Sequence, residues 1–395
     1  MHETTSPDLL IQQLPPQRHS LRLAVVTETY PPEINGVALT LACLVHTLRE
    51  RGHAIQLIRP RQPVEGSPAQ AVFDQVLTRG IPIPRYPNLR LGLPSKRLLV
   101  STWMQQRPDV VHIATEGPLG WSALRAARKL RLPVSTDFRT HFESYSQHYG
   151  VGWLRKPIES YLRKFHNQAD CTLTPTESLQ QSLVRARFER VHVVSRGVDT
   201  HRFHPSHRSQ ALRHTWGAAP GQPVALCVGR LAPEKNLSLL IRTVQMTHAT
   251  NQHLKWVIVG DGPARKDLQA ALPQAHFAGS RSGNDLAAHY ASADWFAFPS
   301  LTETFGNVVP EAMASGLAVL AYDRAAAAEL IRHEQTGLLA PPGDEAQFLA
   351  CAHRLAAEPD LAPRLAAAGQ SAVQHMGWEA IADQMEAIWS NLMAT

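Results

Sequence analysis

The sequence predicts an α/β protein with two doubly wound domains, each built on a parallel sheet between helices. Three observations support this prediction. Short apolar segments rich in Val, Ile and Leu alternate with stretches of helical periodicity along most of the chain. This alternation stops near Arg196–Pro205 and then starts again. At 395 residues, the chain is long enough for two or three domains, each with its own core.

The first half of the chain opens with the apolar segment Leu21–Thr27, followed by a turn that contains prolines and Gly36. The helical pattern of Val37–Arg51 comes next and ends at Gly52, a residue type common just after helices. Further strands are predicted at Ala54–Arg59, Asp109–Ile113, Val134–Asp137, Cys171–Thr174 and Val191–Val194, with a helix at Gly117–Leu130. These elements predict a first domain over residues 21–200, after a loose tail at 1–20.

The second half repeats the alternation of strand and helix. Strands are predicted at Val224–Gly229, Trp256–Gly260, His276–Gly279, Trp295–Phe298 and Leu317–Ala321. Helices are predicted at Leu237–Thr247, Ala264–Leu272 and Val308–Ser315. A further helix is predicted in the segment that ends at Ser292. We therefore expect a second domain over residues 206–375. A last amphipathic helix is predicted from Trp378 to Leu392.

Charge is distributed unevenly between the two halves. Residues 1–205 carry 26 Lys and Arg against 16 Asp and Glu, a balance of +10, whereas residues 206–395 carry 13 against 17, a balance of −4. This asymmetry predicts that the first half meets a polyanion, such as a nucleic acid, an anionic bilayer or a phosphate-bearing lipid.

Cysteine usage and hydropathy indicate the compartment. The four cysteines are scattered without a close pair, so neither a disulfide framework nor a zinc site is indicated. No segment of eighteen apolar residues occurs, and residues 1–20 lack the apolar core of a signal peptide. We expect a cytoplasmic protein that can lie peripherally on the inner face of the membrane.

The stretch Pro299–Gly316, PSLTETFGNVVPEAMASG, carries the strongest chemical signal. A loop and the start of a helix together offer free backbone N–H groups, which can bind a phosphate. Glu303 lies before this turn and Glu311 lies about one helical turn beyond it, so each can accept hydrogen bonds from a diol. A nucleotide sugar presents a diol, a diphosphate and a second diol in this order.

The pattern Glu-x-Phe-Gly, four residues, Glu and Ala-Met-Ala-x-Gly resembles the retaining glycosyltransferases of the GT-B fold, family 4. A second motif, Gly229–Asn236 or GRLAPEKN, extends the resemblance, which covers about Leu21 to Gly343. It implies two Rossmann-like domains facing each other across a central cleft, with the helix at 378–395 returning to the first. The motifs are most similar to those of bacterial α-mannosyltransferases acting on lipids, which favours GDP-mannose as the donor.

The resemblance also implies roles for individual residues. Arg230 and Lys235 would neutralise the departing diphosphate, while Glu303 would hold the donor sugar and Glu311 the ribose. Gly36 would let the backbone approach the donor phosphate from the first domain. The remaining donor-binding candidates are Gly229, Gly260, Ser280, Phe305, Gly306, Asn307 and Val308. Two plainer interpretations stay open: a surface ion pair between Arg230 and Glu234, and a simple tight turn at Gly36.

The sequence departs from the family pattern after the strand at Val134–Asp137. The family usually has a donor-contacting histidine there, in a His-Thr-x-Phe-like segment. Here Arg139 stands at the histidine position and His141 lies two residues further on. Strand-like alternation would point both side chains to the same side. Either His141 takes the usual role, or Arg139 contacts the sugar or an acceptor phosphate.

No Asp-x-Asp motif occurs in the chain, and the cations near the diphosphate offer an alternative to a metal ion. We therefore predict catalysis without a metal or other cofactor. No carboxylate stands out as a nucleophile, so attack on the same face of the sugar as the leaving group is the preferred route to retention.

Two basic segments bear on the acceptor, for which a lipid or glycan is expected. Trp153–His166 mixes aromatic residues with two basic pairs, which suits either a bilayer surface or a packed helix with a solvated basic face. Arg85–Arg97 is basic and interrupted by prolines, and could line an acceptor cleft.

Three alternative functions remain open. A nucleotide-sugar epimerase of the same fold would need an acid/base set around the sugar, and a lipid glycosyltransferase could use a UDP-hexose. A basic nucleic-acid-binding protein would bind with a steep salt dependence. No helix-turn-helix, zinc finger or aromatic-basic RNA signature supports the last, so we expect no nucleic-acid partner.

Overall fold

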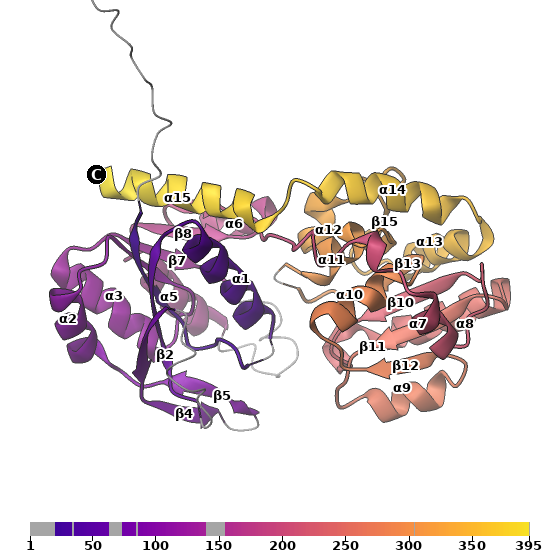
Figure 1. The fold of residues 1–395 in the computed structure, drawn as a ribbon, viewed down its shortest axis with the longest axis horizontal. Helices are drawn as coiled ribbons and strands as arrows, with labels where there is room; N and C mark the ends of the chain where they lie inside the picture. The colour runs from indigo at the N-terminus through magenta and orange to yellow at the C-terminus, as the bar shows by residue number, and fades with distance from the viewer. Residues whose placement is uncertain are drawn as a thin grey trace, which may run out of the picture.

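The computed structural model describes residues 20–33, 35–62, 73–83, 86–139, 155–303 and 305–394. Two α/β units lie side by side, each with helices on both sides of a sheet (Figure 1). The first sheet ends at Val193 and the second begins at Val224.

The first unit contains a seven-stranded parallel sheet with the strand order β3-β2-β1-β6-β7-β8-β9. Its strands are β1 (Arg22–Val26), β2 (Ala54–Pro60), β3 (Asp74–Thr78), β6 (Val110–Ile113), β7 (Val134–Asp137), β8 (Cys171–Thr174) and β9 (Val191–Val193). An antiparallel hairpin is formed by β4 (Gly80–Ile83) and β5 (Tyr86–Gly92). The helices are α1 (Gly36–Glu50), α2 (Lys96–Gln105), α3 (Pro118–Leu130), α5 (Arg155–His166) and α6 (Glu177–Arg185).

The second unit contains a six-stranded parallel sheet with the order β12-β11-β10-β13-β14-β15. Its strands are β10 (Val224–Val228), β11 (Lys255–Val259), β12 (His276–Gly279), β13 (Trp295–Phe298), β14 (Ala318–Tyr322) and β15 (Leu338–Ala340). The helices are α7 (Gln210–Thr215), α8 (Leu237–Thr250), α9 (Arg265–Ala271), α10 (Gly283–Ala291), α11 (Val308–Ala314), α12 (Ala325–Leu330), α13 (Glu345–Ala357) and α14 (Leu361–Val373).

The final helix, α15 (Trp378–Ala394), lies over the first unit, although it follows the second in sequence (Figure 1). Its buried face joins the apolar core formed by α1 and β1. The indole of Trp389 is fully buried and donates a 2.8 Å hydrogen bond to Ser135 Oγ on β7. The chain therefore crosses between the units twice.

Local sequence explains the boundaries of α1, whose Thr40 contacts the second unit in the site described below. Asn35 caps its start, because its side chain accepts a hydrogen bond from the backbone N–H of Ala38. Gly52 follows its end with a φ of +92°, a left-handed conformation that glycine adopts without strain. The predicted strand, glycine turn and helix are thus present at the start of the first unit.

Most of each predicted basic segment is described, whereas Arg85, Trp153 and Leu154 lie outside the described residues. The segment from Arg85 to Arg97 contains β5 and the beginning of α2, which the sequence reasoning did not anticipate. In α5, Leu162 and Phe165 are buried in the first unit, while Lys156 and Lys164 are exposed. The apolar face of this helix therefore packs on its own domain and leaves its basic face in solvent.

No helix in the described ranges combines the length and the apolar character needed to cross a bilayer.

Candidate active site

The candidate site lies where the strand order of the second sheet reverses. β10 and β13 are neighbours at the centre of the sheet, and the chain proceeds outward from them in opposite directions. In open α/β sheets, ligands bind outside the carboxyl ends of strands at such a switch point. Gly229 and Arg230 directly follow β10, and Pro299–Glu303 directly follow β13. Both predicted motifs therefore begin at the same edge of the sheet.

An ion pair joins the two motifs. The ammonium of Lys235 contacts Oε1 of Glu303, and Ser300 Oγ donates a 2.8 Å hydrogen bond to the same oxygen. Both charged side chains are largely buried, at 24% and 18% exposure for Lys235 and Glu303 respectively. The cation and the carboxylate that the sequence assigned to diphosphate and sugar are thus within contact distance.

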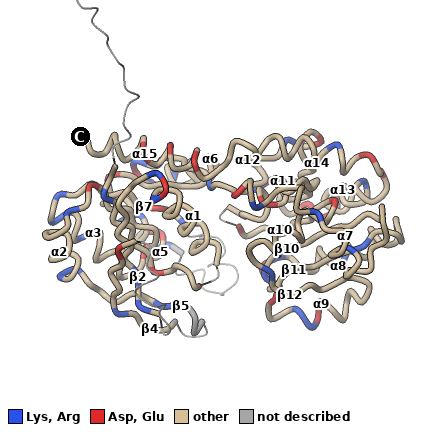
Figure 2. Tube along the Cα trace, in the orientation of Figure 1, with Lys and Arg blue, Asp and Glu red and all other residues tan. Residues whose placement is uncertain are grey.

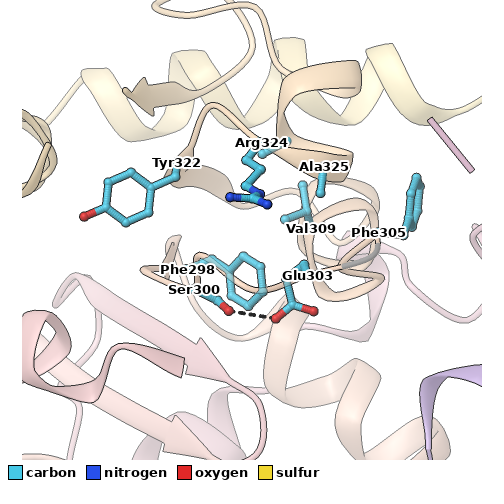
Figure 3. Close-up of a pocket in the computed structure, with 9 residues that line it drawn as sticks. Phe298, Ser300, Glu303, Phe305, Val309, Tyr322, Arg324 and Ala325 are labelled. Carbon is cyan, nitrogen blue, oxygen red and sulfur yellow. Dashed lines mark hydrogen bonds between the residues drawn. The ribbon is translucent and has the colours of Figure 1, made fainter. Parts of the chain in front are cut away.

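Two small pockets flank this pair and share Phe298 and Ser300 in their walls. One is lined by Gly229, Arg230 and Lys235. Figure 3 shows the other, where the Glu303 carboxylate and the Ser300 hydroxyl point toward each other. Each pocket is bordered by one member of the ion pair, so a ligand in either contacts a charged group.

Arg230 itself is 56% exposed and forms an ion pair with Glu234. This contact is the one that the plainer interpretation of the motif anticipated. The arginine nevertheless lines the same pocket as Lys235, so both cations adjoin one space.

Glu311 lies in the first turn of α11. Its Oε2 accepts a 3.0 Å hydrogen bond from Tyr290 Oη. Burial raises the pKa of Glu311 to about 7, whereas Tyr290 and the positive charge of Arg202 act to lower it. Its position one helical turn beyond Gly306 agrees with the sequence expectation.

Glycines shape the loops around the pockets. Gly306 has a φ of +88°, so a side chain there would strain the loop before α11. At Gly260, a Cβ atom would lie 1.9 Å from the carbonyl oxygen of Gly229. The loops after β10 and β11 can therefore approach each other only because this position has no side chain. Ser280 follows β12 at an exposed position, and Val308 begins α11.

Asn307 connects this site to the first unit. Its Nδ2 donates a 3.1 Å hydrogen bond to Thr40 Oγ1, and that hydroxyl donates a 2.6 Å hydrogen bond to the carbonyl of Gly36. Gly36 is the first residue of α1, and a Cβ atom added there would meet nothing within 4 Å. The two donor-binding candidates thus lie on facing elements, joined through one threonine.

Arg139 follows β7 and pairs with Asp137, with only 6% of the side chain exposed. The pKa of Asp137 is lowered, because Arg139, His112 and Arg196 together outweigh the opposing effect of burial. Burial lowers the pKa of His112, which lies 3.9 Å from Asp137, to about 4. His141, the other candidate for the usual histidine role, lies outside the described residues.

Within the described parts of the chain, no group of three or more His, Cys, Asp or Glu side chains is arranged to hold a metal ion.

Comparison with known proteins identifies the family. Residues 34–202 match the family model described as Glycosyltransferase Family 4, and residues 222–358 match Glycosyl transferases group 1. The GDP-mannose-dependent alpha-mannosyltransferase of Mycobacterium tuberculosis is 36% identical over 370 residues, which span 92% of this chain and 95% of that protein. The chain is a family 4 glycosyltransferase.

This glycosyltransferase is also similar to a more distant relative and to a solved structure. The alpha-monoglucosyldiacylglycerol synthase of Streptococcus pneumoniae is 25% identical over 335 residues, which span 81% of this chain and 75% of that enzyme. The crystal structure of HepE from Anabaena with UDP and glucose superimposes with a TM-score of 0.74 at 20% identity, covering 94% and 100% of the two chains. This likeness confirms the predicted GT-B fold.

The structure adds site residues of the glycosyltransferase that sequence reasoning did not select. Tyr290 comes from α10, which is separated from the donor loop in sequence by β13. Arg324 lines the same pocket as Glu303, and its side chain points into it in Figure 3. Its position two residues after β14 was an available signal, because that strand is adjacent to β13.

Proposed function

We propose that this enzyme transfers a mannosyl group from GDP-mannose to a lipid or glycan acceptor, with retention of anomeric configuration and without a metal ion. The observation that carries the proposal is the contact between Lys235 and Glu303 at the switch point of the second sheet. It unites the group suited to a diphosphate with the group suited to sugar hydroxyls.

The donor follows from the site and from the relatives together. Glu311, with its partner Tyr290, offers a carboxylate to the ribose diol, while Glu303 offers one to the hexose. The mannosyltransferase similarity, at 36% identity across nearly the whole chain, favours GDP-mannose over UDP-hexoses. A UDP-hexose donor remains the second candidate, because exposed Ser280 supplies little to distinguish the bases.

The chemistry assigned to the chain is stabilisation of a leaving group. As the bond between the sugar and the diphosphate breaks, negative charge develops on the phosphate oxygens. Lys235 and Arg230 adjoin one pocket and can neutralise this charge. Lys235 is largely buried, where electrostatic stabilisation is strong, whereas Arg230 is more exposed. These two cations support metal-independent transfer.

Retention is assigned to attack on the face that the leaving group departs from. Glu303 already accepts contacts from Lys235 and Ser300, an arrangement that suits a hydroxyl-binding carboxylate better than a nucleophile. The departing phosphate would then accept the proton of the incoming hydroxyl, so that no separate protein base is needed.

A lipid acceptor is supported by the charge of the first unit. Figure 2 shows Lys and Arg positions around α2 and near β4 and β5. Lys156 and Lys164 of α5 are further exposed cations of the first unit. Anionic lipid attracts such residues with about 1 kcal/mol for each cation near the surface. We propose peripheral contact with an anionic membrane on this basis.

The test combines binding with product analysis. A thermal-shift series with GDP, UDP, GDP-mannose and UDP-glucose should raise the melting temperature most with the guanine compounds. Product analysis with the preferred donor, with and without an anionic glycolipid extract as acceptor, then separates transfer from epimerisation. An epimerised donor sugar in the absence of acceptor would contradict the proposal, as would turnover that a chelator abolishes.

A further inference from the structure

Arg196 lies on the connection that leaves the first unit after β9, and only 9% of it is exposed. The backbone around it is held in place by the second connection between the units. The N–H of Val198 donates a 2.9 Å hydrogen bond to the carbonyl of Met376, and a Cβ atom at Gly197 would lie 2.7 Å from the ring of Trp378. Arg196 therefore extends from a fixed point between the two units.

The side chain of Arg196 reaches the donor loop of the second unit. Its Cζ lies 5.7 Å from the centroid of the Phe305 ring, a cation–π distance. Phe305 is 2% exposed and lies between Glu303 and Gly306 in the sequence of the loop. Arg196 thus contributes a positive charge to the candidate site from outside the second unit.

The carboxylates near Arg196 are already paired with other cations. Asp137 is paired with Arg139, and Glu303 is paired with Lys235. Within the described ranges, no oxygen accepts a hydrogen bond or forms an ion pair with Arg196. Burial and the neighbouring charge of Arg139 lower its pKa to about 9, while Asp137 and Glu303 act to raise it.

Although 9% of Arg196 stays exposed, the guanidinium lies at the edge of the site with five N–H donors that make no hydrogen bond to a described residue. A phosphate is the ligand group that matches this fork of donors. The cluster of Arg139, Arg196 and Lys235 carries three positive charges against the two carboxylates of Asp137 and Glu303. The site therefore has an excess of positive charge, suited to an anion.

We propose that Arg196 binds a phosphate oxygen of the nucleotide sugar's diphosphate, as a cation supplied by the connection between the domains. The donor is favoured over a phosphate on the acceptor, because Arg196 lies over Phe305 of the loop that carries Glu303. The inference rests on the proposed function, and it adds a specific residue to the donor site. It also means that the donor contacts the connection between the two units.

The test compares nucleotide affinity with stability in the full-length chain. Arg196→Met replaces the guanidinium with an apolar side chain of similar reach and removes a charge that has no ion-pair partner in the described ranges. The melting temperature without ligand should therefore equal or exceed that of the wild type. The dissociation constant for whichever of GDP and UDP binds the wild type should rise about tenfold or more, as for loss of a charged hydrogen bond.

Two further variants sharpen the result. Arg196→Lys keeps the charge without the planar fork, so its affinity should fall between those of the wild type and Arg196→Met. Arg185→Met removes an exposed arginine on α6 and should leave nucleotide affinity unchanged. Calorimetric titration of each variant with GDP and UDP supplies the comparison.

The outcomes separate this inference from the function on which it rests. A wild-type protein that binds neither GDP nor UDP would contradict the proposed function itself. Wild-type binding with unchanged affinity in Arg196→Met would overturn only the role of Arg196, whether or not stability falls. If Arg196→Met lost wild-type binding to phosphatidylglycerol vesicles but kept its nucleotide affinity, the phosphate would belong to the acceptor. That result would overturn the assignment to the donor.

Discussion

The phenol of Tyr290 donates a 3.0 Å hydrogen bond to Oε2 of Glu311. Tyr290 is fully buried, and the burial of Glu311 raises the pKa of that carboxyl to about 7. Near neutral pH, the protonated and ionised forms of Glu311 are therefore both populated in the protein without ligand. With Glu311 as the proposed ribose ligand, this balance predicts that nucleotide binding is sensitive to pH.

The affinity for GDP should increase as the pH rises from about 6 to about 8. Below its raised pKa, Glu311 is a neutral acid, whereas above it the carboxylate could accept hydrogen bonds from both hydroxyls of the ribose that we propose it binds. Calorimetric titrations across this range measure the effect. Glu311→Gln should bind GDP weakly at every pH and lose this dependence. An unchanged pH profile in Glu311→Gln would assign the dependence to another group.

The same substitution should stabilise the protein without ligand at pH 8. Because the pKa of Glu311 is raised from 4.5 to about 7, the native state binds more protons than the unfolded state between these values. Stability from this group is therefore present at low pH and is lost as the pH rises through about 7. Glu311→Gln cannot ionise, and its amide oxygen can still accept the Tyr290 hydrogen bond. Its melting temperature should exceed that of the wild type at pH 8. The difference should shrink toward pH 5, because that pH is close to the ordinary pKa of a glutamate. A lower melting temperature at pH 8 would contradict this account.

Lys235→Ala should lower kcat/KM by about 10²–10³-fold, the usual effect of removing a group that stabilises transition-state charge. Lys235 is the cation in contact with Glu303, and it lines the pocket beside Arg230. Lys266→Ala, on the exposed face of α9, is the matched control and should retain wild-type activity. Steady-state kinetics with the preferred donor measure both. Near-wild-type turnover in Lys235→Ala would remove Lys235 from the catalytic machinery.

Alanine substitutions at Gly36 and Gly260 should affect different properties, donor binding at the first and stability at the second. Gly36→Ala should preserve the melting temperature, because the added Cβ meets nothing within 4 Å, but it should raise the KM for the donor if the phosphate approaches this backbone. Gly260→Ala should lower the melting temperature, because its Cβ would collide with the carbonyl of Gly229. Thermal unfolding and donor kinetics on both variants separate the two cases. An unchanged KM in Gly36→Ala would favour the interpretation of Gly36 as a simple turn.

The sequence predicted best those elements whose signals are local. β7, β8 and β13 have the predicted bounds, because each is a short segment rich in β-branched or aromatic residues between breaks in the pattern. The pairing of the Gly229–Asn236 motif with Glu303 was also predictable, since each motif follows a strand and the carboxyl ends of parallel strands share one edge of the sheet.

The remaining features depend on contacts between distant segments. β3 and β5 have no regular apolar alternation. The pairing of each strand with its own neighbour, β2 or β4, is therefore decided by the surrounding structure rather than by local pattern. Tyr290 and Arg196 reach the site from α10 and from the connection after β9, and nothing in their own sequence surroundings marks them. Such residues become visible only once the sheet order and the crossing of the chain are known.

Trp389 provides a test of the role of α15 in the first unit. Its indole ring is fully buried, donates to Ser135 Oγ and lies edge-on to His112, with 5.8 Å between ring centroids. Trp389→Ala should therefore destabilise the protein by about 3–5 kcal/mol, from lost burial and the cavity left behind.

Chemical denaturation monitored by circular dichroism measures this loss. Met393→Ala, at a 38% exposed position near the end of the same helix, should change stability by less than about 0.5 kcal/mol. If the two units unfold separately, the transition assigned to the first should shift and the other should not, because α15 packs with α1 rather than with the second sheet. Equal stability of Trp389→Ala and Met393→Ala would mean that the first unit does not depend on the helix that returns to it.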